Sequence, residues 1–435
     1  MLKSFTFGCG QGATKAMLCA INTGVLDEDY CMIVNSTSKD IPENYVDNAM
    51  IISDDKDAGC GKIREAAKTM MSNYLKSNPN IITNLIFNED NPIDFVNIIA
   101  TSEGASGSGA SVVLAKYIKY LADINDLDIT VNIILITGFE SDTRGLQNTI
   151  NYFKDLNGAD YTIRIVSNKK YLETCATTFE AEEMANNEVA SVLSILGGSD
   201  IISSDHNIDN TDHMRLISNP GLIFTGEVNM KNKKYKNTDQ LNKELSDMVD
   251  YTSSLDFNPS ATMLGVYMNV SEDNMSAVDT SFSIIKKKLC GTDSVPELFV
   301  HKQYNGRDQF IRVIASGLDL PQAELEIMYN KYENNICNTK SNADGFFDRL
   351  SSMYSDMLSK KKSVKKVVAG DFFDEFDQNS EEVNKVMKRT TKTSKLSNNN
   401  TITTEEKPAK SSNLFKTNSK KDKVVDYSED SIEKY

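Results

Sequence analysis

The stretch Thr101-Ser-Glu-Gly-Ala-Ser-Gly-Ser-Gly-Ala-Ser111 decides the fold that this sequence predicts. It follows Phe95–Ala100, a short apolar run typical of a buried strand in a parallel sheet, and it precedes residues 112–122, whose apolar positions have helical spacing. Small residues at such a junction let backbone N–H groups approach an anion at the helix N-terminus, where the helix dipole favours negative charge. We interpret the stretch as a phosphate-binding loop. For a Gly/Ser-rich loop taken alone, a flexible turn is the alternative.

A second glycine loop, Phe7-Gly-Cys-Gly-Gln-Gly-Ala-Thr-Lys-Ala-Met17, repeats the order of strand, loop and helix near the start of the chain. Two phosphate loops in one domain indicate a nucleotide. A Rossmann dinucleotide site would need an acidic residue about 20 residues further on. The second strand, Cys31–Val34, is instead followed by Asn35-Ser-Thr-Ser-Lys39. Neither loop has the Gly-Lys-Ser/Thr ending of a Walker P-loop.

Composition indicates a soluble protein with a full core. The chain has 435 residues, 40% of them apolar, which is enough for two domains and a tail. It contains no apolar run of the roughly 18 residues that a membrane helix requires, so we expect no membrane contact. The seven cysteines and three histidines lack the spacing of a metal site, and we therefore predict no protein-bound metal cluster and a reducing, cytoplasmic location.

Charge is distributed unevenly along the chain. The net charge is −15, but residues 388–423 carry ten Lys or Arg against three acidic residues. The last twelve residues are acidic again. The folded part should therefore repel polyanions, and any contact with nucleic acid should come from the tail.

Strands and helices alternate over residues 1 to about 180, which predicts an α/β fold with a doubly wound parallel sheet. Residues 182–196 then place apolar side chains on one helix face, as a central helix between two domains would. From about residue 260 the pattern changes to a smaller α+β domain followed by helices. After about residue 379, Lys, Ser, Thr and Asn predominate, which predicts disorder.

A third motif, Asn207-Ile-Asp-Asn-Thr-Asp212, follows the predicted central helix. Its two acidic residues are three positions apart, so on a first helical turn they would share one face. An acidic N-terminal cap is the alternative role for them. Together with the two phosphate loops and the central helix, this motif resembles the Asn-x-Asp-x-x-Asp synergy loop of the tubulin/FtsZ superfamily.

The resemblance extends over residues 3 to 335 and assigns roles to further segments. Asn35-Ser-Thr-Ser-Lys-Asp40 resembles the family's second nucleotide loop, and Asp57-Ala-Gly-Cys-Gly-Lys62 resembles the third, which senses the γ-phosphate. Glu103–Gly109 replaces the family signature Gly-Gly-Gly-Thr-Gly-Ser/Thr-Gly, departing from it at its first and third positions. Glu140 would contact the ribose, Arg144 the phosphate side, and Asn187 the guanine.

The nucleotide-binding residues implied by the resemblance come from all of these loops: Gly8, Gly10, Gln11, Gly12, Asn35, Ser36, Gly59, Gly61, Lys62, Gly104, Ala105, Ser106, Gly107, Ser108, Gly109, Glu140, Arg144 and Asn187. The implied catalytic residues are Asn207, Asp209 and Asp212, where the carboxylates orient the attacking water. The implied cofactors are GTP or GDP and Mg²⁺.

The same resemblance gives a domain plan for a tubulin-like GTPase. It consists of a GTP-binding domain (1–181), a central core helix (182–197), the synergy loop with connecting helices (198–259), an α+β activation domain (260–320), C-terminal helices (321–378) and a disordered basic tail with an acidic end (379–435).

In that superfamily, Asp209 and Asp212 would act on the nucleotide of the adjoining subunit, so hydrolysis would need assembly. The resemblance is strongest to the branch that segregates plasmid or phage DNA, which implies head-to-tail filaments and a DNA-bound adaptor held by the tail. Several alternatives stay open: a phage spindle or division-type tubulin, a filament protein without hydrolysis, and a Rossmann-type dinucleotide enzyme.

Overall fold

A computed structural model of the chain describes residues 2–55, 59–88, 92–198, 208–231, 233, 235, 238–252, 258–292, 295–303 and 310–339. All of them belong to one compact unit, residues 1–385. Asn207, Asp57 and the predicted tail lie outside the described residues, as do residues 340–378 of the predicted C-terminal helices.

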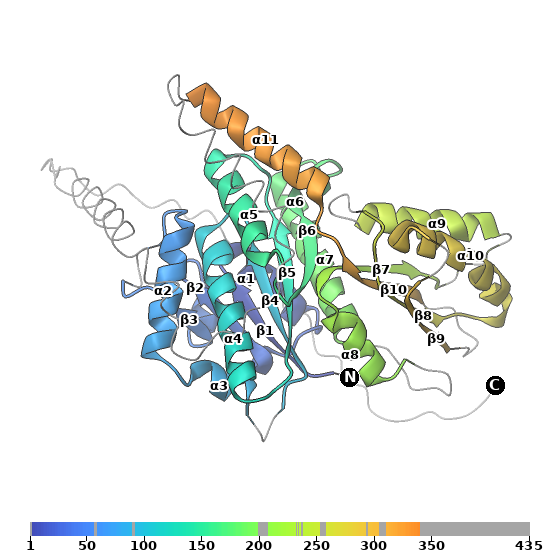
Figure 1. The fold of residues 1–435 in the computed structure, drawn as a ribbon, viewed down its shortest axis with the longest axis horizontal. Coiled ribbons are helices and arrows are strands. Elements are labelled where there is room, and N and C mark those ends of the chain that lie inside the picture. The colour runs from blue at the N-terminus through green and yellow to red at the C-terminus, as the bar shows by residue number, and fades with distance from the viewer. Residues whose placement is uncertain are drawn as a thin grey trace, which may run out of the picture. The chain divides into compact units, whose positions relative to one another are not determined.

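Ten strands form a single sheet in the order β3-β2-β1-β4-β5-β6-β7-β10-β8-β9 (Figure 1). Their bounds are β1 Ser4–Cys9, β2 Cys31–Asn35, β3 Ala49–Ile51, β4 Phe95–Thr101, β5 Thr130–Thr137, β6 Thr162–Ser167, β7 Gly221–Asn229, β8 Met263–Asn269, β9 Glu297–Gln303 and β10 Phe310–Leu318. Strands β1 to β6 pair in parallel, as the alternating pattern predicts, while β10 is antiparallel to both β7 and β8.

Helices lie between the strands in sequence and cover the sheet. Their bounds are α1 Gln11–Asn22, α2 Arg64–Ser77, α3 Ile81–Ile86, α4 Ser111–Ile124, α5 Thr143–Leu156, α6 Asn168–Leu172, α7 Thr178–Leu196, α8 Asn210–Ser218, α9 Thr238–Thr252, α10 Glu272–Cys290 and α11 Gln322–Thr339. Helices α2, α4 and α5 lie side by side, α1 packs on α7, α9 packs on α10, and α11 packs on α5 (Figure 1).

Strand β7 was not expected from the sequence. The predicted plan assigned residues 198–259 to a loop and connecting helices, but Gly221–Asn229 is a nine-residue strand. It begins with Gly221 at φ +114° and pairs in parallel with the start of β6 through two residues. It then pairs antiparallel with β10 along most of its length. The sheet is therefore continuous between the two predicted α/β regions.

A ladder of buried polar side chains crosses the four central strands. Asn97 Nδ2 donates to Thr6 Oγ1 at 3.4 Å, Asn132 Nδ2 donates to Asn97 Oδ1 at 3.5 Å, and the Thr162 hydroxyl donates to Asn132 Oδ1. These four residues are also the backbone partners in the register of β1, β4, β5 and β6. A slip of one residue would leave these groups buried without partners, so the ladder favours one register.

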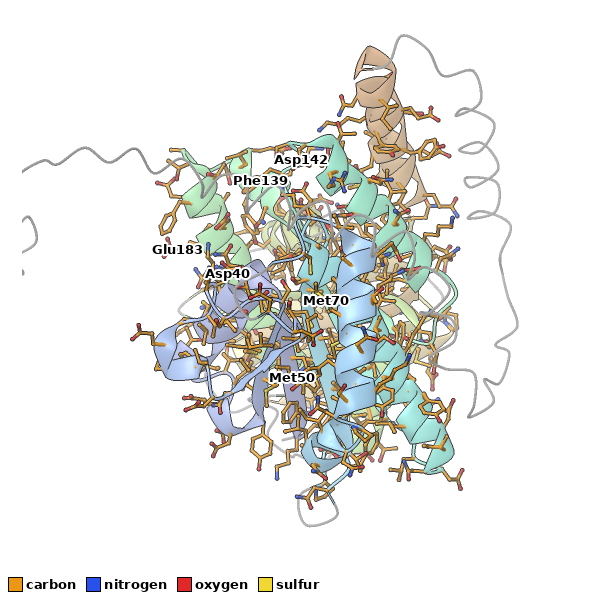
Figure 2. The ribbon with its side chains drawn as sticks, turned by 90° about the vertical axis from the view of Figure 1, so that its left-hand side faces the viewer. Asp40, Met50, Met70, Phe139, Asp142 and Glu183 are labelled. Atoms are coloured by element: carbon orange, nitrogen blue, oxygen red, sulfur yellow. The ribbon has the colours of Figure 1, made fainter. Side chains whose placement is uncertain are left out.

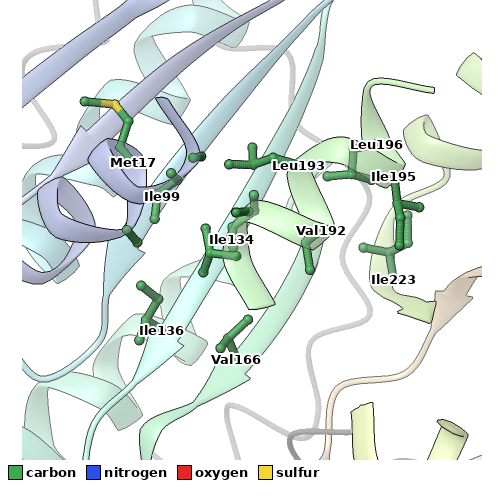
Figure 3. Packing of buried hydrophobic residues seen from close by; sticks show 14 of the residues in the cluster. Met17, Ile99, Ile134, Ile136, Val166, Val192, Leu193, Ile195, Leu196 and Ile223 are labelled. Carbon is green, nitrogen blue, oxygen red and sulfur yellow. The ribbon is translucent and has the colours of Figure 1, made fainter. Parts of the chain in front are cut away.

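Helix α7 is the predicted central helix, and its apolar face lies on the sheet. Val192, Leu193 and Leu196 pack with Ile134 and Val166 in a cluster that also includes residues of α1 (Figure 3). At its middle, Glu188 forms a 2.7 Å ion pair with Arg164 of β6, and both side chains are buried. Arg164 Nε also donates to Thr225 Oγ1 of β7 at 3.2 Å. Removing one partner of a buried pair typically costs about 3–5 kcal/mol, so the pair holds α7 in place across β6 and β7.

Candidate functional site

The carboxyl ends of the central parallel strands define one edge of the sheet. Because Cys9 pairs with Ala100, Thr101 with Ile136 and Thr137 with Ser167, these strands end at the same level. Ligands of open α/β sheets bind at this edge. Phe139 and Asp142, from the loop after β5, lie there together (Figure 2).

A cavity of about 350 Å³ opens at this edge. Its walls come from the ends of β4 and β5, from the loops after β3, β4 and β5, and from α1, α6 and the first half of α7: Gln11, Gly12, Lys15, Lys62, Thr101, Glu103, Gly104, Ile136, Gly138, Phe139, Asn168, Glu182 and Asn186. The volume falls in the range of small-molecule and cofactor sites.

The signature loop contains a π-helical turn. Residues Ser106–Ala110 form a π-helical turn that continues directly into α4. π-turns occur frequently at functional sites. A Cβ atom on Gly107 would lie 2.4 Å from Thr101 Oγ1 and 2.6 Å from the Thr101 carbonyl oxygen. Gly107 is therefore required because the loop folds back onto the end of its own strand.

The predicted phosphate loops converge. A Cβ atom on Gly10, which has φ +84°, would lie 3.0 Å from the backbone nitrogen of Gly107. The Ser36 and Ser106 hydroxyls are 3.0 Å apart, which joins the second loop to the signature loop. Burial raises the pKa of the Cys60 thiol, and hydrogen bonds with the same two serines lower it. The first, second, third and signature loops therefore meet at one place.

Lys62 and Asp142 connect the third loop to the loop after β5. Their side chains form a 2.7 Å ion pair, and this hydrogen bond from Lys62 is the main cause of the lowered pKa of Asp142. Asn148 of α5 donates to the backbone oxygens of both Lys62 and Glu103, at 3.3 and 3.0 Å. The lysine at the cavity wall is thus fixed from two sides.

Glu103 occupies the position where the family signature has its first glycine. Its Oε1 accepts the backbone N–H of Glu140 at 2.6 Å, and its carboxyl group fills the space above Gly138, where a Cβ atom would come within 2.2 Å of it. Burial raises the pKa of Glu103, and the charges of Asp142 and Glu140 raise it further. The cavity therefore has a carboxyl group beside its phosphate loop.

Glu140 and Arg144 do not line the cavity. Glu140 is buried at φ +53°, and its carboxylate accepts from Lys169 of α6 and Lys331 of α11, each at 3.1 Å. Arg144 is exposed, and its charge lowers the pKa of Tyr332 on α11, against the larger effect of burial. Glu140 therefore joins the loop after β5 to α11.

On α7 the cavity is lined by Glu182 and Asn186. Glu182 forms a 3.2 Å ion pair with Lys15 of α1, which also lines the cavity. Asn187, the residue predicted to read guanine, is exposed, and its Oδ1 accepts from the Cys19 thiol at 3.4 Å. The side-chain amide that lines the cavity is that of the preceding residue, Asn186.

Asn168 gives the cavity an unsatisfied acceptor. Its Oδ1 is buried and has no hydrogen-bond partner among the described residues. Buried polar atoms are rarely left unpaired, so this oxygen suits a ligand that brings a donor.

Asp209 and Asp212 lie on α8. Asp209 is the N-cap of this helix, and its Oδ1 accepts the backbone N–H of Asp212 at 2.8 Å. The capping role considered for this motif is therefore real for Asp209, although its exposed carboxylate can still accept other donors. Neither residue lines the cavity.

Four of the predicted nucleotide-binding residues line the cavity: Gln11, Gly12, Lys62 and Gly104. Others, including Gly10, Ser36, Ser106 and Gly107, form the loops behind it. The sequence reasoning missed Lys15, Thr101, Ile136, Gly138, Phe139, Asn168, Glu182 and Asn186 as wall residues. For Thr101, Ile136, Gly138, Phe139 and Asn168 the available signal was their place at or just after the carboxyl end of a strand, whereas Lys15, Glu182 and Asn186 lie inside helices.

Neither the families nor the curated proteins compared with this sequence give a match. Solved structures do. TubZ from Bacillus thuringiensis serovar israelensis, in a GTPγS-form protofilament, has a TM-score of 0.61 at 13% identity, covering 78% of this chain and 94% of that one. CetZ2 from Haloferax volcanii, in a GTPγS-bound protofilament, has a TM-score of 0.59 at 18% identity, covering 78% and 99%. TubZ of Clostridium botulinum phage c-st has a TM-score of 0.55 at 15% identity, covering 78% and 98%.

Two further features concern membranes and metals. None of the helices in the described ranges combines the length and the apolar character needed to cross a bilayer. In the same ranges, no three His, Cys, Asp or Glu side chains are grouped so that they could hold a metal ion.

Gly107→Ala should destabilise the fold, because the new Cβ would collide with the Thr101 backbone as well as its side chain. We expect the free energy of unfolding to fall by about 1–3 kcal/mol, the usual cost of overpacking. Gly59→Ala is the matched control, since a Cβ there meets no atom within 4 Å. Equal thermal unfolding midpoints for the two variants would contradict this steric account.

Proposed function

We propose that this chain, which has the fold of the tubulin/FtsZ superfamily, binds GTP in the cavity and hydrolyses it when subunits assemble head to tail. The phosphates would lie on the converging glycine loops, beside the N-terminus of α4 and the charge of Lys62. Asn168, Glu182 and Asn186 would contact the ribose and base, since they line the cavity from α6 and α7.

Mg²⁺ fits this donor set as an ion carried by the nucleotide. It usually keeps several waters and binds substrate phosphates with only one or two protein oxygens, so a dedicated cluster of carboxylates is not needed. Gln11 lines the cavity beside Gly12 and supplies an amide oxygen. The ion would neutralise phosphate charge.

The separation of the cavity from α8 supports hydrolysis between subunits. Helix α7 lines the cavity at Glu182, and its other end, at Leu196, contacts α8. Fourteen helical residues span roughly 21 Å at 1.5 Å each. Helix α8 lies at the end of α7 away from the cavity (Figure 1), so Asp209 and Asp212 are too far away to reach the phosphate loops of their own chain. They would orient the attacking water on the nucleotide of a second copy.

A cavity at one end of the subunit and its complementary carboxylates at the other make a heterologous contact. Such contacts extend into open filaments unless a rotation closes a ring. The TubZ and CetZ2 structures are themselves protofilaments. A dinucleotide enzyme of closed symmetry is the competing function, because the order β3-β2-β1-β4-β5-β6 is also that of Rossmann sheets. Bound guanine nucleotide with GTP-triggered light scattering supports the first function, and bound NAD supports the second.

Asp209→Asn and Asp212→Asn should each slow phosphate release by on the order of 10²–10⁴, while GTP binding and assembly persist. Asparagine keeps the N-cap at position 209, so the helix should remain folded. Asp239→Asn, an exposed acid in the first turn of α9, is the matched control. Phosphate release per subunit should rise above a critical concentration. A constant rate per subunit down to high dilution would refute the shared site.

Glu103→Gln should strengthen GTP binding, because it removes a negative charge beside the phosphate loop. Relief of about 1.4 kcal/mol of repulsion would raise affinity tenfold. Since the pKa of Glu103 is raised, the wild-type carboxyl takes up its proton at a higher pH than an ordinary glutamate. The difference between the proteins should therefore shrink as pH falls. Glu183→Gln, an exposed site on α7, is the control. Weaker binding by Glu103→Gln would show that the carboxylate mainly holds the Glu140 loop.

The finer proposal is that these cytoplasmic filaments segregate plasmid or phage DNA through an adaptor bound to the tail. It is supported by the ten basic residues at 388–423 in an otherwise acidic chain. Deleting residues 379–435 should spare GTP hydrolysis and abolish co-sedimentation of filaments with the adaptor–DNA complex. The interaction should also weaken steeply with salt if lysines neutralise phosphates. Equal cargo recovery with and without the tail would remove it from the mechanism.

A further inference from the structure

His213 is a buried histidine on the helix that carries the two acidic residues. It is 2% exposed and makes a hydrogen bond with each ring nitrogen. Nε2 lies 2.8 Å from the carbonyl oxygen of Leu196, and Nδ1 lies 2.6 Å from the Tyr267 hydroxyl. A carbonyl can only accept, so Nε2 carries the proton and Nδ1 accepts from Tyr267.

These two bonds connect three elements. Leu196 is the last residue of α7, where helix carbonyls lack partners within the helix. Tyr267 belongs to β8 and is fully buried, and its ring meets that of His213 edge-on with centroids 5.7 Å apart. His213 therefore anchors α8 both to the end of α7 and to the sheet.

The position of His213 in α8 determines what this anchor controls. It directly follows Asp212 and lies in the same first turn that Asp209 caps, and its own N–H donates to the Asp209 carbonyl at 2.9 Å. Successive helix residues are rotated by about 100°. With His213 fixed in the core, the direction of the Asp212 side chain is set as well.

We propose that His213 and Tyr267 are positioning residues that hold the first turn of α8 in the orientation in which Asp209 and Asp212 meet the nucleotide of the next subunit. This inference rests on the proposed hydrolysis between subunits. Phenylalanine at both positions would fill the same space, so packing alone does not require two polar side chains here.

The charges around the pair favour neutral histidine. Burial lowers the pKa of His213, and Arg312 of β10 lowers it further, while the hydrogen bond with Leu196 opposes the shift. Arg312 itself is paired with Glu227 of β7 at 2.8 Å. Burial raises the pKa of Tyr267, the charge of Arg312 lowers it and the charge of Asp212 on α8 raises it. The His301 ring of β9 lies 6.1 Å from that of Tyr267.

The pH dependence follows from this lowered pKa. The neutral ring contributes its full stabilisation above the ordinary histidine pKa of about 6.5, and the contribution is lost as pH falls below that value. Protonation would place a second positive charge near Arg312 and remove the acceptor that holds the Tyr267 proton. Hydrolysis by the assembled protein should therefore decline only as pH falls through the lowered pKa of His213.

The test uses Tyr267→Phe and His213→Gln in the full chain, with Tyr117→Phe as the control. Like Tyr267, Tyr117 is a buried tyrosine with a hydrogen-bonded hydroxyl. The Tyr117 hydroxyl donates to the backbone carbonyl of Pro79. Phosphate release per assembled subunit should fall by on the order of tenfold in both test variants, because small displacements of reacting groups are costly. GTP affinity and critical concentration should match the wild type. The control should match it throughout.

Two further measurements separate positioning from general instability. The rate ratio of His213→Gln to wild type should increase as pH falls through the lowered pKa of His213, since glutamine does not titrate. Hydrogen exchange in α8 should accelerate in Tyr267→Phe, while β5 stays protected. Wild-type rates in both variants, or a pH-independent ratio, would overturn the inference. If the wild type assembles without releasing phosphate, the proposed function is overturned instead. In that case, unchanged hydrogen exchange in α8 of Tyr267→Phe would also exclude the role of His213 and Tyr267 in anchoring this helix.

Discussion

The register of the four central strands is the constraint on which the rest of the molecule depends. Thr6, Asn97, Asn132 and Thr162 are buried and hydrogen-bonded in a row, so β1, β4, β5 and β6 cannot shift independently without leaving polar groups unpaired. Because the strands are parallel and in this register, their following loops leave the sheet at one level. The convergence of the glycine loops is a consequence of that alignment, and so is the cavity.

The sequence predicted the parallel sheet, the central helix and glycine loops at one edge of the sheet, because strand, glycine and helix follow one another in a short-range pattern. It did not predict what depends on contacts between distant segments. Strand β7 was missed since it contains two glycines and its partner β10 is far along the chain. Asn186 lines the cavity but was not predicted, because a shift of one residue from Asn187 turns the side chain by about 100° on a helix. Glu182 and Phe139 line the cavity only through tertiary packing.

Departures from the family pattern are linked to each other in space. A carboxyl group at position 103 would be an isolated charge at a phosphate loop, but here it accepts the backbone N–H of Glu140 and lies near Lys62. Glu140 does not line the cavity, and its carboxylate accepts from Lys169 of α6 and Lys331 of α11. Glu103 in the signature loop therefore hydrogen-bonds the loop after β5, and Glu140 in that loop pairs with two lysines. A continuous series of contacts therefore leads from Glu103 in the cavity wall through Glu140 to Lys331 of α11.

Helix α7 connects the cavity to α8, the helix that carries Asp212. Its first turns line the cavity and its last carbonyl is bound by His213, so the two halves of the proposed hydrolytic site lie at opposite ends of one rigid element. The buried pair of Arg164 and Glu188 fixes the helix at its middle, against both β6 and β7. Buried ion pairs contribute little net stability, but they penalise any displacement that separates the charges. The distance between cavity and carboxylates is thereby set by the length of α7 and by the pair of charges that holds it. In the proposed function, a second copy of the chain would therefore bring the two halves together.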